Sequence, residues 1–152
     1  MTDSAAPGIF DRLIGEWKFV REVPGKATMT GRARIVPTRE GWARYEETAR
    51  VRLADGTTMS GSQSYLYRRL PPSANGFDVL FAENGELFER LEFREASDRS
   101  FHAAAERLCN DDRYVSKFSL DADDLLAVEH TVTGPGKNYV VRTTYRRSGR
   151  SA

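Results

Sequence analysis

The amino-acid sequence predicts an all-β protein: an antiparallel up-and-down β-barrel of about ten strands, preceded by a short helix. Two observations support this prediction. Turn signals recur at short, fairly even intervals along the 152 residues, and most segments between them alternate apolar and polar side chains, as half-buried strands do. A barrel is favoured over an open sheet because closure removes exposed strand edges. A β-sandwich is the alternative that the same pattern allows.

Clusters of Gly, Pro, Asn and Asp divide the chain into ten segments. Asp55-Gly56 and Asn84-Gly85 are the strongest of these signals, because type I′ hairpin turns need a positive φ at both central residues. Alternation is clearest in the segment after Gly41, where one face carries Ala43, Tyr45, Glu47, Ala49, Val51 and Leu53. The Ala-rich segment from Ser100 to Leu108 fits either a strand or a helix.

The predicted helix covers Ile9 to Ile14, between Pro7 and Gly15. Its apolar stripe would close one end of a barrel. The chain length suits one domain. We expect an N-terminal segment with the helix at 1–14, the barrel domain at 15–147 and a disordered tail at 148–152.

Composition and charge exclude several functional classes. The 23 basic and 22 acidic residues give a net charge of +1, without the basic excess of a nucleic-acid-binding protein. No apolar stretch approaches the roughly 18 residues of a membrane span, and the N-terminus lacks the pattern of a signal peptide. The single cysteine, Cys109, excludes an internal disulfide and fits a reducing compartment. We therefore expect a cytoplasmic protein, monomeric or homodimeric, that binds neither nucleic acid nor membranes.

The sequence predicts no metal and no other cofactor. His102 and His130 are the only histidines, and no residues have metal-ligand spacing. His130 shares a face with apolar residues of its strand, so it is the better candidate for a haem ligand or an acid–base group. A lone histidine there is more typical of a hydrogen-bonded core residue. The roles of His102, His130 and Cys109 stay open.

The inward faces of the predicted strands carry more polar groups than a packed core would. By alternation they are Arg21, Glu47, Gln63, Tyr65, Tyr67, Glu89, Tyr114, His130, Tyr139 and Tyr145. A buried carboxylate needs a partner, so we expect Glu47 to pair with Arg21. These residues indicate either a polar pocket for a ligand or an internal network that satisfies itself.

Three hypotheses of function follow, and the first is favoured. The protein binds a small organic molecule, without catalysis, in a lumen lined by Arg21, Glu47, Gln63, Tyr65, Tyr67, Tyr114 and Tyr139, with Lys137 at the rim. Alternatively it is an enzyme in which Glu47 is the general base and Tyr114 or Lys137 the partner acid. In the third hypothesis a filled barrel is only a scaffold for interactions. No catalytic residue is assigned under the favoured hypothesis.

Gly15-Glu16-Trp17 begins the first predicted strand and resembles the Gly-x-Trp of calycins, the lipocalin-like barrels. In calycins this tryptophan closes the barrel floor and a basic residue of the last strand covers it. Arg146 or Arg147 is in the matching place. An arginine over an indole ring forms a favourable cation–π contact.

From about Gly15 to Arg147 the chain resembles a family of uncharacterised bacterial lipocalin-like proteins, a domain of unknown function. The motifs are Gly15-x-Trp17-x-Phe19-x-Arg21, Tyr45-x-Glu47, Tyr65-x-Tyr67-Arg68, Cys109-x-x-Asp112-x-Tyr114, Lys137-x-Tyr139 and Tyr145-x-Arg147. The resemblance implies the barrel fold and no established activity. The family pattern has histidines near Glu89 and Arg107 and a tryptophan near His130, and this sequence departs from it at all three.

Overall fold

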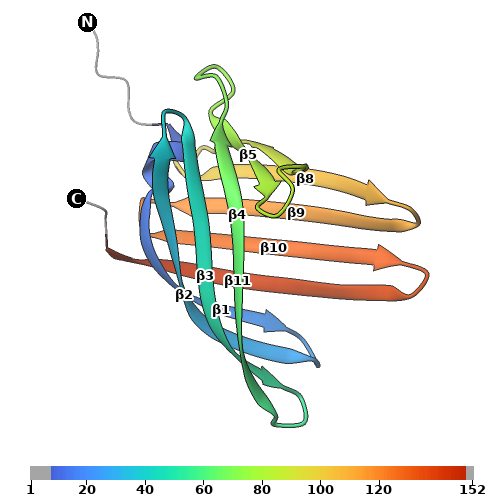
Figure 1. The fold of residues 1–152 in the computed structure, drawn as a ribbon. Helices are drawn as coiled ribbons and strands as arrows, with labels where there is room; N and C mark the ends of the chain where they lie inside the picture. The colour runs from blue at the N-terminus through green and yellow to red at the C-terminus, as the bar shows by residue number, and fades with distance from the viewer. Residues whose placement is uncertain (1–7, 150–152) are drawn as a thin grey trace, which may run out of the picture.

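One antiparallel sheet makes up nearly all of the protein (Figure 1). The computed structural model describes residues 8–149, in which a short helix, α1 (Ile9–Leu13), leads into eleven strands. The strands are β1 (Gly15–Val23), β2 (Ala27–Arg39), β3 (Trp42–Leu53), β4 (Thr58–Arg69), β5 (Gly76–Phe81), β6 (Leu87–Glu92), β7 (Arg94–Glu95), β8 (Phe101–Cys109), β9 (Asp112–Asp121), β10 (Leu125–Gly134) and β11 (Lys137–Gly149). The all-β prediction is confirmed.

The sheet curls into a nearly closed barrel. Its strand order is β6-β5-β4-β3-β2-β1-β11-β10-β9-β8-β7, so consecutive strands pair and β1 pairs with β11. In Figure 1 β2, β3 and β4 run across β8 to β11. Strand β6 lies against β8. This single continuous sheet excludes the two-sheet sandwich.

The chain forms eleven strands instead of about ten because one predicted segment divides at Phe93. Residues before it, in β6, pair with β5, whereas Arg94 and Glu95 pair with β8. The Phe93 side chain is buried, and its backbone N–H donates to the carbonyl of Asn75. This segment therefore spans the seam between the two edges of the sheet.

The Ala-rich segment is a strand, β8, and not a helix. It pairs with β9 along its whole length. Its alternate residues Ala103, Ala105 and Arg107 are more buried than their neighbours. Pairing in the sheet outweighs the helix propensity of alanine here.

The end of the barrel next to α1 is closed. Ile9, Phe10 and Leu13 of the helix are buried, and the indole N–H of Trp17 donates to the Leu13 carbonyl at 3.0 Å. The Arg147 guanidinium carbon lies 4.3 Å from the Trp17 ring centroid. The guanidinium nitrogens of Arg147 donate to three backbone carbonyls, those of Ile14 (2.9 Å), Asp123 and Arg12. The basic residue over Trp17 is thus Arg147, and the floor follows the predicted pattern.

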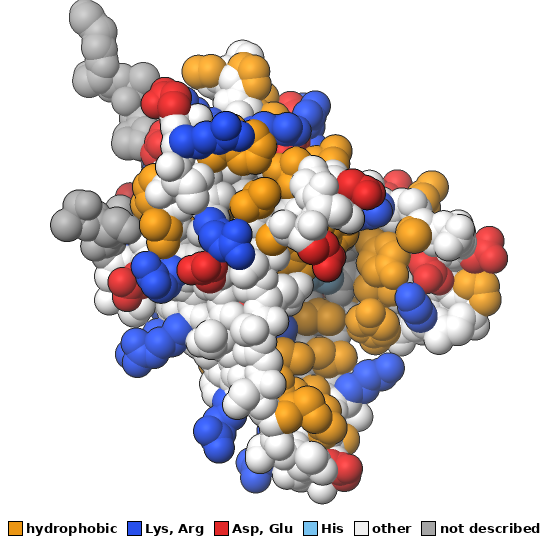
Figure 2. All heavy atoms as spheres, in the orientation of Figure 1, with side chains coloured by type: hydrophobic (Ala, Val, Ile, Leu, Met, Phe, Trp, Pro, Cys, Tyr) orange, Lys and Arg blue, Asp and Glu red, His pale blue; other side chains and the backbone are white. Residues whose placement is uncertain are grey.

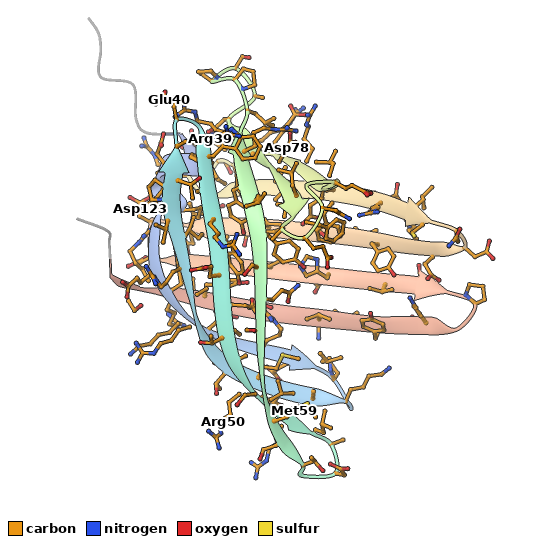
Figure 3. All side chains as sticks on the ribbon, in the orientation of Figure 1. Arg39, Glu40, Arg50, Met59, Asp78 and Asp123 are labelled. Atoms are coloured by element: carbon orange, nitrogen blue, oxygen red, sulfur yellow. The ribbon has the colours of Figure 1, made fainter. Side chains whose placement is uncertain are left out.

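The open end lies at the opposite side, among four hairpins. These are the β1–β2, β3–β4, β8–β9 and β10–β11 turns, which point away from α1 in Figure 1. Figure 3 shows the same separation: Met59 lies near the free tip of the β3–β4 hairpin, far from Glu40 and Asp123 at the closed end. This asymmetry leaves a lumen with a floor and a mouth.

Gly31 of β2 lies where a side chain has no room. A Cβ atom at this position would lie 2.2 Å from the Thr48 carbonyl oxygen and 2.7 Å from the Phe19 ring. Any larger side chain would therefore displace backbone. The Phe19 ring covers the glycine, a device that supports curved sheets, and the Arg21 guanidinium lies 4.5 Å above the centroid of that ring.

The predicted N-terminal segment (1–14) and tail (148–152) are only partly covered by the described residues. Strand β11 continues to Gly149, so Ser148 and Gly149, predicted as tail, belong to the strand. The rest of that tail, 150–152, and residues 1–7 of the N-terminal segment lie outside the described residues. The predicted helix end at Ile14 is its C-cap.

Within residues 8–149 no helix has the length and apolar character needed to cross a membrane.

Candidate functional site

The lumen contains a cavity of about 410 Å³ that reaches the mouth of the barrel. All ten polar residues predicted to face inward line it: Arg21, Glu47, Gln63, Tyr65, Tyr67, Glu89, Tyr114, His130, Tyr139 and Tyr145. Figure 2 shows apolar side chains around a hollow on this face, with a histidine visible inside. Alternation therefore predicted the inward faces correctly, while ligand binding by these residues stays a prediction.

Arg21 and Glu47 form the central ion pair of the lumen. Nη1 and Nη2 of Arg21 donate to the two carboxylate oxygens of Glu47 at 2.7 and 2.9 Å. Nε of Arg21 donates to the Thr143 hydroxyl at 2.8 Å, and Nη2 also contacts the Tyr145 hydroxyl at 3.2 Å. Two parallel charge-assisted bonds fix both planar groups. The predicted pair is thus present at the border of the cavity.

Tyrosine hydroxyls complete this network. Tyr45 donates to Glu47 at 2.5 Å and lies 2.9 Å from the Tyr145 hydroxyl. Burial raises the pKa of both tyrosines, so they stay protonated. Burial alone would lower the pKa of Arg21, but the hydrogen bond to Glu47 and the nearby acidic groups raise it above its ordinary value. Arg21 therefore stays charged although it is buried.

Aromatic rings of β3, β4 and β6 line the wall beside this pair. Tyr65 is stacked on Phe88 with ring centroids 5.9 Å apart, and Tyr67 is stacked on Tyr45 at 5.7 Å. The Gln63 amide donates to the Tyr65 hydroxyl, and burial raises the pKa of Tyr65 to about 12. This wall combines apolar area with fixed hydroxyl groups, as ligand pockets do.

A second polar group, separate from the ion pair, consists of Glu89, Ser116 and His130. The Ser116 hydroxyl lies 2.8 Å from Nδ1 of His130, its cross-strand neighbour. Burial raises the pKa of Glu89 to about 7, although a hydrogen bond from Ser116 acts in the opposite direction. Burial, together with the Arg21 charge, lowers the pKa of His130 to about 4. His130 is therefore an uncharged imidazole at neutral pH.

Lys137 and Tyr114 lie at the mouth, close to each other and not to Glu47. Nζ of Lys137 donates to the Tyr114 hydroxyl at 3.2 Å and pairs with Asp112 at 3.1 Å. These contacts raise the pKa of Lys137. Glu47 accepts its hydrogen bonds from Arg21 and Tyr45. The structure thus does not bring the predicted base into hydrogen-bond contact with either predicted acid.

His102 and Cys109 are outside the lumen. Nε2 of His102 lies 2.6 Å from the Ser100 hydroxyl, which also contacts Asp98 in a local turn. Cys109 is exposed at the end of β8. Within residues 8–149, no three His, Cys, Asp or Glu side chains gather in a way that could hold a metal ion.

Sequence reasoning missed three contributors to the site. Tyr45 and Ser116 were on the predicted inward faces, but nothing in the sequence showed that their hydroxyls contact Glu47 and His130. Phe88 lines the cavity next to Glu89, which strict alternation forbids. A register shift between Val79 and Leu80 explains it, because Glu89 pairs with Val79 while Leu87 pairs with Leu80.

The fold and the site together define a nearly closed antiparallel β-barrel with an internal cavity. Residues 13–147 match the family of unknown function DUF6314, and the chain belongs to this family. No curated protein matches the chain.

Among solved structures the chain is similar to the S-type phycobiliprotein lyase CPES from Guillardia theta. The identity is 11%, the alignment covers 95% of this chain and 92% of the lyase, and the TM-score is 0.56. It is also similar to the redesigned β-barrel mFAP1 bound to DFHBI, at 12% identity over 93% of this chain and 100% of that one, with a TM-score of 0.45. The likeness to the lyase supports the barrel fold.

Proposed function

We propose that this protein is a calycin-type barrel that binds a small organic molecule in its lumen. The observation that supports this most strongly is the cavity of about 410 Å³, which falls within the range of small-molecule sites. A scaffold with no ligand would gain stability from a filled interior, because empty volume loses packing contacts. The retained space therefore favours a ligand over the scaffold hypothesis.

The polar groups of the lumen favour binding over catalysis. Arg21 and Glu47 hold each other through two hydrogen bonds, so they form a rigid polar surface in which each charged group already has its partner. Gln63, Tyr65 and Tyr139 extend this surface toward the mouth, where Lys137 stands at the rim. Fixed polar groups among aromatic walls orient a ligand. We also propose a cytoplasmic location, because a single cysteine fits a reducing compartment.

Two neighbouring valines of β11 allow a matched test. Val141 lines the cavity, whereas Val140, on the other face of the strand, does not. We expect the neutral dye Prodan to bind the wild type saturably, with a blue shift of its emission. Val141→Trp fills lumen volume and should weaken this binding at least about tenfold, whereas Val140→Trp should bind the dye like the wild type. Circular dichroism and thermal melts would verify the fold of both variants.

Two results would contradict the proposal. Equal dye binding by Val141→Trp and the wild type would place the dye outside the lumen. Failure of the wild type to bind Prodan and a panel of cationic, neutral and anionic aromatic probes would mean that the lumen is no ligand site.

A further inference from the structure

Glu89 is a buried carboxyl group that faces the cavity. Its exposure is 7%, and it lines the lumen from β6. The register shift in the β5–β6 pair turns both Phe88 and Glu89 inward. The strand irregularity thus places an aromatic ring and an acid side by side on the lumen wall.

No cation of the described chain neutralises Glu89. Within residues 8–149 it forms no ion pair, and its polar contact is the Ser116 hydroxyl. A buried carboxylate without a cation is costly, and most proteins avoid one. Glu47, the other buried glutamate of the lumen, has Arg21 as its cation.

The charged and titratable groups around Glu89 do not supply the missing cation. Tyr65 and Tyr67 of β4 face it with hydroxyls that stay protonated. His130 of β10 is uncharged at neutral pH. Arg107 of β8 lies over the rings of Phe81 and Phe88, at 5.1 and 5.8 Å from their centroids, and forms no ion pair with Glu89.

The aromatic rings beside Glu89 also favour a positive charge. Tyr65 and Phe88 are stacked and both line the cavity, and the faces of such rings attract cations. An anionic ligand would find no free cation deep in the lumen, because every nitrogen of the Arg21 guanidinium is already bonded to Glu47, Thr143 or Tyr145. The charge distribution therefore selects for a ligand that carries a positive nitrogen.

We propose that the lumen ligand is a small organic amine whose protonated nitrogen pairs with Glu89 beside the rings of Tyr65 and Phe88. This inference rests on the proposed function and specifies the chemical class of its ligand. The amine would supply the cation that Glu89 lacks within the described residues. The apolar part of the amine would lie along the remaining aromatic and aliphatic wall.

The ionisation of Glu89 gives this pairing a pH dependence. Burial holds the pKa of the free carboxyl at about 7, and an ammonium group beside it would lower that pKa. Amine binding below about pH 7 must therefore release a proton from Glu89. Affinity should fall as the pH decreases through this range, and it should level off above it.

Three probes of similar shape separate charge from size: phenethylamine, phenethyl alcohol and phenylacetate. We expect calorimetric titration of the wild type at pH 8 to give affinity for the amine at least about tenfold above that for the alcohol, with phenylacetate weakest. Between about pH 6 and pH 5 the affinity for the amine should fall by up to about tenfold. Glu89→Gln keeps the side-chain volume and should remove both the amine preference and the pH dependence. Glu86→Gln removes an exposed charge from the same hairpin and should change neither.

The outcomes separate this inference from the proposed function. If the amine and the alcohol bind the wild type equally, the lumen binds ligands but does not select amines. A preference that persists in Glu89→Gln would also overturn the assignment, because another group would recognise the nitrogen. The wild-type probe series and its pH dependence decide the question even if Glu89→Gln fails to fold. Failure of the wild type to bind Prodan and the other aromatic probes would instead contradict the proposed function itself.

Discussion

Burial moves Glu89 and His130 toward their uncharged forms from opposite directions. The pKa of Glu89 rises to about 7 and that of His130 falls to about 4, because an apolar environment disfavours either charge. Neither group gains a charged partner within the described chain. Strongly shifted groups in a cavity are typical of functional sites, which is why the proposed ligand site is centred on these residues and not on Glu47, whose carboxylate is already bonded to Arg21 and Tyr45.

The shifted carboxyl predicts a pH-dependent stability difference between the wild type and Glu89→Gln. The folded pKa, about 7, lies above the ordinary value of 4.5. The favourable contribution of protonated Glu89 is therefore complete below about pH 4.5 and is lost as the pH rises through about 7. The free energy of unfolding of Glu89→Gln, relative to that of the wild type, should therefore increase by about 3 kcal/mol between pH 4.5 and pH 8.

Urea unfolding of both proteins across this range would measure the difference. His130 titrates in both, so its contribution cancels to first order. Glu86→Gln, an exposed change in the same hairpin, should follow the wild type at every pH. A difference between Glu89→Gln and the wild type that stays constant with pH would contradict the assigned shift.

Much of the site could be predicted at the residue scale, and the remainder depends on contacts that alternation does not describe. A period of two is enough to place Arg21, Glu47 and Glu89 inside, since each strand has one inward face. It cannot show that the Tyr45 hydroxyl contacts Glu47, because that contact depends on side-chain conformation. The inward position of Phe88 could not be predicted for a different reason: a register shift in the β5–β6 pair breaks the period of two.

At the scale of elements, one side chain joins three strands. Arg21 of β1 bonds to Glu47 of β3 and to Thr143 and Tyr145 of β11. The contact to β3 passes across β2, so it fixes the curvature of the sheet as well as its register.

Replacing Arg21 with Met should destabilise the protein by roughly 3–5 kcal/mol, because Glu47 is left buried without its cation. Arg21→Met combined with Glu47→Gln should recover part of this loss. Arg142→Met is the matched control: Arg142 also pairs with a glutamate, but both side chains are substantially exposed, so its loss should stay near 1 kcal/mol or below. Denaturant unfolding would compare the three variants. Similar small losses for Arg21→Met and Arg142→Met would show that the central pair contributes little.

Two elements show where sequence patterns were insufficient. The segment before Ala96 was predicted as one strand, but it changes partners at Phe93, and no local signal reveals which edge each half joins. The segment after Ser100 fitted both helix and strand, since alanine suits either. Pairing with β9, a long-range contact, decided the outcome.

On the scale of the whole molecule, the barrel has one closed and one open end. Trp17, Arg147 and α1 close the floor, a feature that Gly15-Glu16-Trp17 and the terminal arginines predicted. The tips of four hairpins surround the mouth (Figure 1). The volume of the lumen could not be predicted, because it depends on how far the facing walls stand apart.

The most direct test of the account is a crystal structure of the protein with phenethylamine bound. The account predicts density for the probe inside the lumen, with its nitrogen within hydrogen-bond distance of the Glu89 carboxylate and its ring among the aromatic side chains around Tyr65 and Phe88. Density for the probe only on the outer face of the barrel, or a lumen closed by its own side chains, would contradict it.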